Sequence, residues 1–508
     1  MVLSEGIGLY SAMNDLKYDI RIASAGRELV AIEDFRLAES SVTVLFGESG
    51  IGKSLSALAI AGLLDPDQLE VRLNGMTYGD YLRSAELSNI RRNGFFVFQE
   101  PSSHLNPLMT LRTQLREGAL AKTPGEERIL ERLWQGASTS QVESILDVYP
   151  KPYRPSGGEK QRILAAMAFK KMSASVAATP GAVFIFDEPT GNLDNKLRDE
   201  FLDLLVENFR ARHGTVLLIT HDYSLISRFT SSYADLAKRI HYKELLLVRG
   251  KLQLKEFLPS AYLDWIGDRK GRARSTRDNE VFAKLEPSLQ VFGRTLLVTR
   301  DRAGKNPEPL LIRKGSIVYL KAPSGVGKTT VVKLMMGLLS PERMSMNLKG
   351  VEYTERTRRK TWFEHVWGRQ MAMVFQHADE ALNQNAFVRD VFAGLPLGAP
   401  MDDEAILRTL SELFEDELDR EFLRKPVKHL SGGQKQRLNL LRSMVLDTDI
   451  LILDEPLNGL DFESSVKVLA KIEERLRRGK SVLVISHNEE IFDSLADPED
   501  VYYLHALS

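Results

Sequence analysis

The chain has 508 residues, of which 43% are hydrophobic and 27% charged, a composition that supports sizeable cores in more than one domain. The formal net charge is −1, so no overall basic field favours nucleic acid, and we expect no nucleic-acid partner. The absence of cysteine excludes disulfides and cysteine-ligated zinc or iron–sulfur clusters. The N-terminus has no signal-peptide pattern, and no apolar run approaches the ~18 residues of a membrane span.

The first chemical motif is a glycine-rich loop. Residues 42–46 (VTVLF) predict a buried strand, residues 47–54 read GESGIGKS, and an apolar stretch at helical spacing follows. Strand, loop and helix together are the context of a P-loop, where backbone N–H groups and a helix N-terminus surround phosphates. Lys53 is expected to reach the β- and γ-phosphates, and Ser54 to ligate Mg²⁺. The ATP-binding candidates in this loop are Gly47, Ser49, Gly50, Gly52, Lys53 and Ser54.

Four further patterns follow in the first half of the chain. An apolar strand ends at Gln99, PSGGEKQR (residues 155–162) opens a helix, VFIF leads into Asp187 and Glu188, and TVLLIT leads to His221. Each alone has an ordinary interpretation, such as a loop amide, solvated carboxylates or a structural histidine. Their combination with a P-loop favours a nucleotide site.

The same series then restarts, which indicates a tandem repeat. The second copy contains APSGVGKT (residues 322–329), Gln376, LSGGQ (residues 430–434), Asp454 with Glu455, and His487. Lys328 follows Lys53 by 275 residues, and Ser431 follows Ser156 by the same 275. Ala322 replaces the first glycine of the P-loop pattern. If that position needs a positive φ, alanine carries a cost, and nucleotide binding there is expected to be weakened.

These motifs resemble the ABC-type ATPases, whose signature motif is LSGGQ and whose Walker B motif is an apolar strand ending in Asp-Glu. The resemblance implies an α/β fold of two tandem P-loop NTPase domains. Each would have a RecA-like core, an antiparallel β subdomain and a helical signature subdomain. We expect domain 1 at residues 1–255, a linker at 256–284 and domain 2 at 285–508. The basic run 268–278 is expected to be solvated linker, with a nucleic-acid contact as the alternative.

The resemblance also implies roles for individual residues, because each signature in this family covers the nucleotide bound by the other domain. The implied catalytic residues are Gln99, Glu188 and His221, and in the second copy Gln376, Glu455 and His487. The implied Mg²⁺ contacts are Ser54, Gln99, Asp187, Thr329, Gln376 and Asp454. The implied ATP contacts beyond the first P-loop are Ser324, Gly325, Gly327, Lys328, Thr329, Ser156, Gly157, Gly158, Ser431, Gly432, Gly433 and Gln434.

The two implied sites are unequal. Site one would combine the first P-loop with LSGGQ, whereas site two would combine the Ala322 loop with a signature in which Pro155 and Glu159 replace Leu and Gln. Site one is therefore expected to turn over faster. Tyr18 and Phe292 are candidates for stacking on adenine, although core packing is the more ordinary interpretation of both.

The segment FQEPSSHLNPLMT (residues 98–110) resembles the ATPase subunits of peptide, opine and nickel importers. This implies an energy-coupling subunit at the cytoplasmic face of the membrane, using ATP and Mg²⁺ and working with two transmembrane permease subunits and a solute-binding protein. The second half also resembles the energy-coupling-factor importers of vitamins and metals. A soluble twin-ABC ATPase that acts on ribosomes or DNA is the alternative from a different class.

Overall fold

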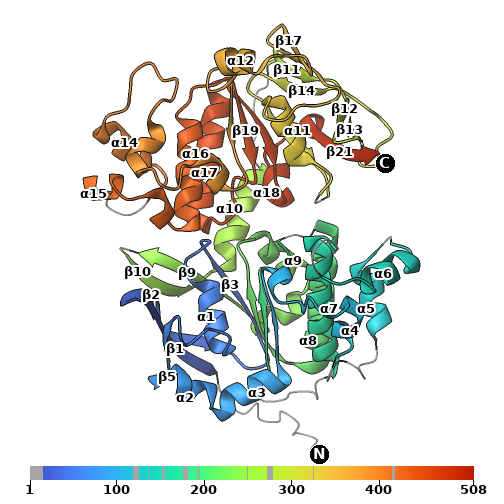
Figure 1. The fold of residues 1–508 in the computed structure, drawn as a ribbon, viewed down its shortest axis with the longest axis vertical. Helices are drawn as coiled ribbons and strands as arrows, with labels where there is room; N and C mark the ends of the chain where they lie inside the picture. The colour runs from blue at the N-terminus through green and yellow to red at the C-terminus, as the bar shows by residue number, and fades with distance from the viewer. Residues whose placement is uncertain are drawn as a thin grey trace, which may run out of the picture.

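Two α/β domains are stacked along the long axis of the molecule, the N-terminal half below the C-terminal half (Figure 1). The computed structural model describes residues 15–117, 120, 125–135, 137–150, 155–174, 181–191, 193, 195–248, 250–271, 278–323, 325–414 and 418–507. Each domain contains a four-stranded antiparallel sheet and a larger, mainly parallel sheet. Within the described ranges, no helix combines the length and apolar character needed to cross a bilayer.

The larger sheet of the first domain positions its P-loop. Its order is β10 (Lys251–Glu256), β9 (Ile240–Val248), β3 (Val42–Gly47), β8 (Thr215–Ile219), β7 (Val183–Asp187) and β6 (Phe95–Val97). Every residue of β3, β7 and β8 is buried, as expected for apolar strands in the middle of a parallel sheet. Helix α1 (Lys53–Ile60) begins at the P-loop lysine, directly after the loop that follows β3.

The smaller sheet of this domain has the order β2 (Arg27–Leu37), β1 (Leu16–Ser24), β4 (Glu70–Leu73) and β5 (Met76–Thr77). Tyr18, Ile20 and Ile22 of β1 alternate with exposed residues, so one face of the sheet lies on the core. The remaining longer helices are α3 (Ala85–Asn93), α5 (Glu126–Leu133), α6 (Thr139–Leu146), α7 (Gly157–Ala174), α8 (Asn195–Arg212) and α9 (Ser224–Ser232).

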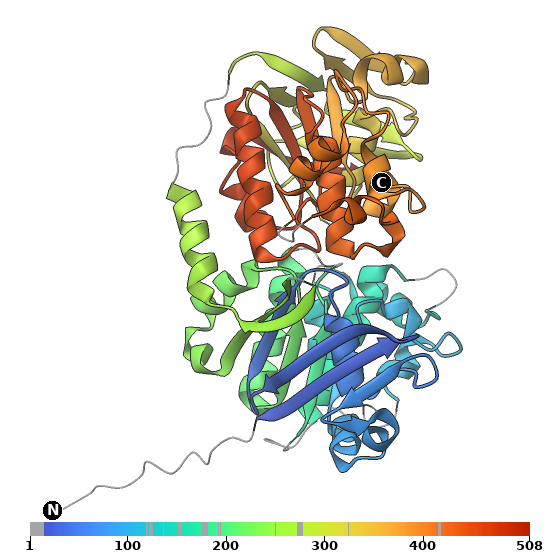
Figure 2. The same cartoon turned by 90° about the vertical axis from the view of Figure 1, so that its left-hand side faces the viewer.

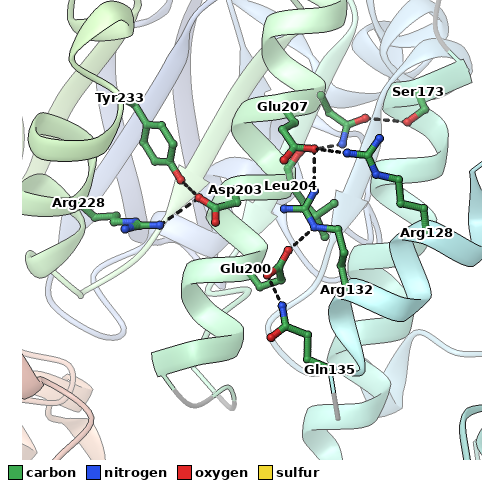
Figure 3. A network of polar contacts seen from close by, with 11 residues as sticks. Arg128, Arg132, Gln135, Ser173, Glu200, Asp203, Leu204, Glu207, Arg228 and Tyr233 are labelled. Carbon is green, nitrogen blue, oxygen red and sulfur yellow. Dashed lines mark hydrogen bonds and ion pairs between the residues drawn. The ribbon is translucent and has the colours of Figure 1, made fainter. Parts of the chain in front are cut away.

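A polar network ties the helical part of the first domain to its core through α8 (Figure 3). Arg132 of α5 forms ion pairs with Glu200 and, at 2.7 Å, with Glu207, both on α8. The Ser173 hydroxyl of α7 donates to Asn208 of α8 at 2.7 Å. The helix that begins with PSGGE is therefore held against the helix that follows the Walker B strand.

The second domain repeats this plan. Its larger sheet has the order β12 (Ser288–Val291), β13 (Arg294–Thr299), β21 (Val501–Leu507), β15 (Ile317–Lys321), β20 (Ser481–Ile485), β19 (Ile450–Asp454) and β18 (Met371–Val374). Its antiparallel sheet has the order β14 (Leu310–Arg313), β11 (Val281–Leu285), β16 (Ser345–Leu348) and β17 (Val351–Thr354). Its main helices are α11 (Lys328–Met335), α14 (Asp403–Leu410), α16 (Gly432–Met444), α17 (Phe462–Arg477) and α18 (Glu489–Asp493).

The region expected to be a linker, 256–284, is largely structured. It contains helix α10 (Pro259–Gly271), which extends from the first domain along the side of the second (Figure 2), and most of β11. The Tyr262 hydroxyl donates to Glu490 at 3.0 Å, Lys270 pairs with the same carboxylate at 2.8 Å, and Arg269 pairs with Glu473. Helix α10 is thus a strap between the domains. Of the basic run 268–278, residues 272–277 lie outside the described residues.

An aromatic cluster joins the domains beside this strap. The ring of Phe462, the first residue of α17, lies 5.5 Å from Tyr223, 5.5 Å from Phe257 and 5.6 Å from Trp265, measured between ring centroids. Glu244 accepts a hydrogen bond from the Tyr223 hydroxyl at 2.5 Å and from the Phe462 N–H at 3.3 Å. One carboxylate of the first domain therefore bridges its own tyrosine to the start of a helix in the second.

We expect Phe462→Ala to weaken the contact between the domains. A fully buried Phe→Ala change costs ~3–5 kcal/mol, and about 2 kcal/mol is expected here because Phe462 is only partly buried. Denaturant unfolding followed by tryptophan fluorescence measures the loss. The control Phe363→Ala removes a ring that is 67% exposed and should change stability by no more than ~0.5 kcal/mol. Equal midpoints for the two variants would contradict a role of this cluster in joining the domains.

Candidate ATP sites

The parallel strands of the first domain bring three predicted catalytic residues together. Gln99, Glu188 and His221 follow β6, β7 and β8, whose carboxyl ends lie along one edge of the sheet. Gln99 Nε2 donates to Glu188 Oε2 at 3.1 Å, and His221 Nδ1 lies 3.3 Å from Glu188 Oε1. Glu188 has a φ of 44°, a strained conformation of the kind that clusters at functional sites.

The first P-loop has the geometry of a phosphate cradle. Lys53 Nζ donates to the Gly47 and Glu48 carbonyl oxygens at 2.6 and 2.9 Å, and these bonds curl its side chain over the loop. Gly47 has a φ of 140°, and an added Cβ would collide with the Leu245 carbonyl oxygen, so only glycine fits.

The pairing of a hydroxyl with a carboxylate suits a divalent cation in both domains. Ser54 Oγ donates to Asp187 Oδ1 at 3.0 Å, and Thr329 Oγ1 donates to Asp454 Oδ2 at 2.7 Å. Oxygen donors are the ligands Mg²⁺ prefers, and it usually takes only one or two from the protein beside those of the substrate phosphates. In the described part of the chain, no group of three or more His, Asp or Glu side chains could hold a metal without such phosphates.

The second domain repeats the cradle with different contacts around its glutamate. Lys328 Nζ donates to the Ala322 carbonyl oxygen at 2.6 Å. Glu455 accepts from the Ser486 hydroxyl and from the His487 N–H, each at 3.1 Å, and also has a positive φ, 49°. Gln376 follows β18 and lines the space between the domains.

The surroundings of the two glutamates shift their pKa values in opposite directions. Burial alone would raise the pKa of Glu188, but His221, Lys53 and the Gln99 hydrogen bond favour its ionised form and lower its pKa to about 2. Burial raises the pKa of Glu455 to about 7, because the His487 N–H and the charge of Lys328 offset burial only in part. The surroundings therefore favour the ionised form of Glu188, whereas burial favours the neutral form of Glu455.

The first P-loop lies against the signature of the second domain. The Ser49 N–H donates to the Gly459 carbonyl oxygen at 2.8 Å, and the Ser49 carbonyl oxygen accepts from the Gly433 N–H at 3.3 Å. Ser431 Oγ caps α16 by accepting from the Gln434 N–H at 3.1 Å, which orients the loop. The structure therefore brings together the two halves expected for site one, one from each domain.

A cavity of about 550 Å³ lies between the domains. It is lined from both sides by the predicted catalytic residues Gln99, Glu188, His221, Gln376, Glu455 and His487. His487 Nε2 lies 3.4 Å from Glu455 Oε1, so the histidine of the second copy also faces the glutamate of its own domain.

The two halves of site two are further apart than those of site one. A Cβ added to Gly50 would lie 3.2 Å from Gly432 N, and one added to Gly432 would lie 3.3 Å from Ser49 Cβ. At the counterpart Gly325, an added Cβ would meet none of the described residues within 4 Å, Gly157 included. The first P-loop therefore touches the opposite signature, whereas the second P-loop is farther from the signature of the first domain at this position. In this sense we call site one assembled and site two open. Ser324, the counterpart of Ser49, lies outside the described residues.

The structure accommodates the two unusual residues that were expected to weaken site two. Ala322 does not adopt a positive φ, so the loop accommodates alanine without the strain that the sequence suggested. Glu159 Oε2 accepts from the Ser156 N–H at 2.7 Å and from its hydroxyl at 2.9 Å. It therefore caps α7 much as Gln434 caps α16, and its carboxylate is satisfied within its own helix end.

The two adenine-stacking candidates differ in their exposure to solvent. Tyr18 is fully buried in the first core and is not a binding residue. Phe292 is 71% exposed at the tip of the β12–β13 hairpin, in contrast to its expected core packing. Leu296 of this hairpin packs 3.3 Å from the position of a Cβ on Gly327, which places the hairpin beside the second P-loop.

Sequence reasoning missed three residues at the assembled site: Glu48 of the P-loop, Arg437 of the signature helix and Gly459. Glu48 Oε1 lies 2.9 Å from Arg437 Nη2, and Gly459 accepts the Ser49 N–H. The P-loop pattern leaves the position of Glu48 unspecified, so no motif could have identified it.

Comparison with known proteins decides the family. A family profile described as ABC transporter matches residues 32–191 and 309–458, more than half of the chain. The chain belongs to the ABC transporter family. It is an ATPase with two fused ATP-binding domains, as its motifs predicted.

Relatives match this ABC ATPase over nearly its whole length. A putative ABC transporter ATP-binding protein of Treponema denticola is 27% identical, with 90% of this chain and 88% of the relative covered. The peptidoglycan transport ATP-binding protein YejF of Agrobacterium fabrum is 26% identical, covering 94% and 89%. The glutathione import ATP-binding protein GsiA of Salmonella choleraesuis is 24% identical, covering 94% and 82%.

A solved structure titled RNase-L Inhibitor matches the fold of the ABC ATPase. It has a TM-score of 0.57 at 20% identity, with 96% of this chain and 89% of that chain covered. At this identity the likeness shows the fold of two tandem ABC domains and nothing of the function.

We expect Glu188→Gln to remove a larger share of ATPase turnover than Glu455→Gln, because the halves of site one are assembled and those of site two are not. Each change should slow its own site by about 10²-fold or more, the usual contribution of a general base. Steady-state phosphate release, measured at saturating ATP for both variants and the parent, gives the comparison. Equal losses would contradict the asymmetry.

Proposed function

We propose that this chain is the energy-coupling subunit of an ABC importer, hydrolysing ATP with Mg²⁺ at two composite sites between its domains. The observation that carries this proposal is the contact of Ser49 with Gly433 and Gly459. It places the first P-loop against the signature of the second domain, and Ser49, Gly432 and Glu188 line the same cavity.

The roles of the residues follow from their chemistry. Lys53 and Lys328 would bind the terminal phosphates, and the Ser54–Asp187 and Thr329–Asp454 pairs would hold Mg²⁺. When bound, Mg²⁺ would neutralise charge on the phosphates. Glu188, held as a carboxylate beside His221, is suited to orient and polarise the attacking water.

The bases of the two nucleotides would be bound differently. In the second domain the exposed Phe292 ring is available to stack on adenine beside its P-loop. In the first domain the corresponding hairpin, between β1 and β2, has Ala25 and Gly26 at its tip and offers no ring. Site one would therefore depend more on contacts to the phosphates.

The class of cargo is inferred from the relatives and the segment 98–110. Two relatives are named for glutathione import and peptidoglycan transport, which favours a peptide or a related small solute. In the segment, His104 stacks on Phe98 with ring centroids 3.3 Å apart, and Leu108 is 84% exposed. An exposed apolar side chain on an ordered loop suits docking to a membrane partner.

The partners proposed are two permease subunits, one for each domain, and a solute-binding protein, with the chain at the cytoplasmic face of the membrane. Energy-coupling-factor import is the nearest variant of this proposal. Action on ribosomes or DNA is the competing class, and the fold likeness to the RNase-L Inhibitor structure does not favour it, because that likeness is at 20% identity.

We expect the tagged chain, purified from native membranes in mild detergent, to bring with it two permease polypeptides identified by mass spectrometry. Leu108→Asp should reduce their recovery about tenfold or more, since burying a charge at a protein interface is costly. The control Leu258→Asp alters another exposed leucine, 68% accessible, and should leave recovery unchanged. Recovery with ribosomes, and without permeases, would contradict the importer proposal.

A further inference from the structure

A buried ion pair joins the first P-loop to the signature helix of the second domain. Glu48 Oε1 lies 2.9 Å from Arg437 Nη2, and their side chains are only 5% and 10% exposed. A Cβ on Gly433 would collide with the Glu48 carboxylate, so the acid lies directly on the second signature glycine. This contact is a nearly buried ionic link between the two halves of site one.

Arg437 also contacts residues at the start of α17 in its own domain. Its Nη1 donates to Ser464 Oγ at 2.9 Å and lies 3.8 Å from Asp461 Oδ2, which caps α17. The loop before α17 contains Gly459, which accepts the Ser49 N–H. The acid of the P-loop is therefore connected both to the signature and to the loop that completes the site.

The repeat supplies an internal comparison, because the same arrangement cannot form at site two. Pro323 occupies the position of Glu48 in the second P-loop, and Arg162 occupies the position of Arg437 in the first signature helix. Arg162 donates to the carbonyl oxygens of Gly158 and Leu133 and lies over the Trp134 ring at 4.7 Å. The arginine is present in both copies, but only the first P-loop offers it an acid.

We propose that Glu48 is a positioning residue that fixes the first P-loop on Arg437 of the second domain, so that the domains separate at site two while site one stays assembled. Removing one partner of a buried pair leaves an uncompensated charge, which makes this contact costly to break. The proposal rests on the composite ATP sites proposed above. It states that site two is the site that opens.

The cysteine-free chain allows a direct test by disulfide trapping. The Cβ of a residue at Gly432 would lie 3.3 Å from Ser49 Cβ, close to the ~3.5–4.5 Å found in disulfides, so Ser49→Cys with Gly432→Cys reports on site one. The matched pair at site two is Ser324→Cys with Gly157→Cys. Without nucleotide and under mild oxidation, the site-one pair should form its disulfide at least about tenfold faster than the site-two pair.

The role of Glu48 is tested in the same background. Glu48→Gln should slow the site-one disulfide about tenfold and leave the site-two disulfide unchanged. Exchanging the charges, with Glu48→Arg and Arg437→Glu together, should restore much of the site-one rate, which a general loss of structure would not allow. Thermal unfolding of each variant verifies that it is folded.

Two outcomes would overturn the proposal. One is an unchanged site-one rate in Glu48→Gln, and the other is equal rates for the two cysteine pairs. Neither readout requires ATP hydrolysis or a membrane partner. Failure of the importer proposal, seen in the permease experiment, is therefore distinguishable from failure of this one.

Discussion

The contact of the first P-loop with the signature loop of the second domain is the interaction on which the rest of this structure depends. A P-loop offers backbone N–H groups to one side of a nucleotide, and we propose that the other domain supplies the opposite side. Ser49 is accordingly held by the second domain through both its N–H and its carbonyl oxygen, against Gly459 and Gly433. Helix α10 and the rings around Phe462 join the domains next to this contact. They keep the first P-loop aligned with the signature of the second domain.

The two copies differ next to their P-loops. In the first copy, Phe46 stacks on Tyr223 at 4.4 Å, and Tyr223 belongs to the ring cluster that reaches the second domain through Phe462. At the equivalent positions of the second copy, Lys321 pairs with Glu489 at 3.1 Å within the second domain. Apolar packing in the first copy is thus replaced by an ion pair in the second.

Much of the fold and most of the site could be predicted from the sequence, because P-loop chemistry depends on short motifs at fixed places. Lys53, Glu188 and His221 follow strands that are buried and apolar, and Asp187 is the last residue of one, so their position at one sheet edge follows from topology. The repeat then predicted the same arrangement for the second half of the chain.

The remaining features depend on contacts that local sequence does not encode. Helix α10 is stabilised by Glu473 and Glu490, more than 200 residues away. The polar, basic run 268–278, which begins within this helix, indicated only a linker. The expected strain at Ala322 is absent, because the loop takes a different backbone path there. Glu48 was missed because its partner is supplied by the other domain.

The central claim is that each ATP site combines the P-loop of one domain with the signature of the other. Its most direct test counts ATP retained per chain by filter binding, with Glu188→Gln and Glu455→Gln introduced to prevent turnover. Lys53→Ala with Gly433→Asp damages only site one and should leave about one nucleotide bound. Lys53→Ala with Gly158→Asp damages both sites and should leave almost none. The reverse result, retention only in the second combination, would show that each domain completes its own site and would contradict the account.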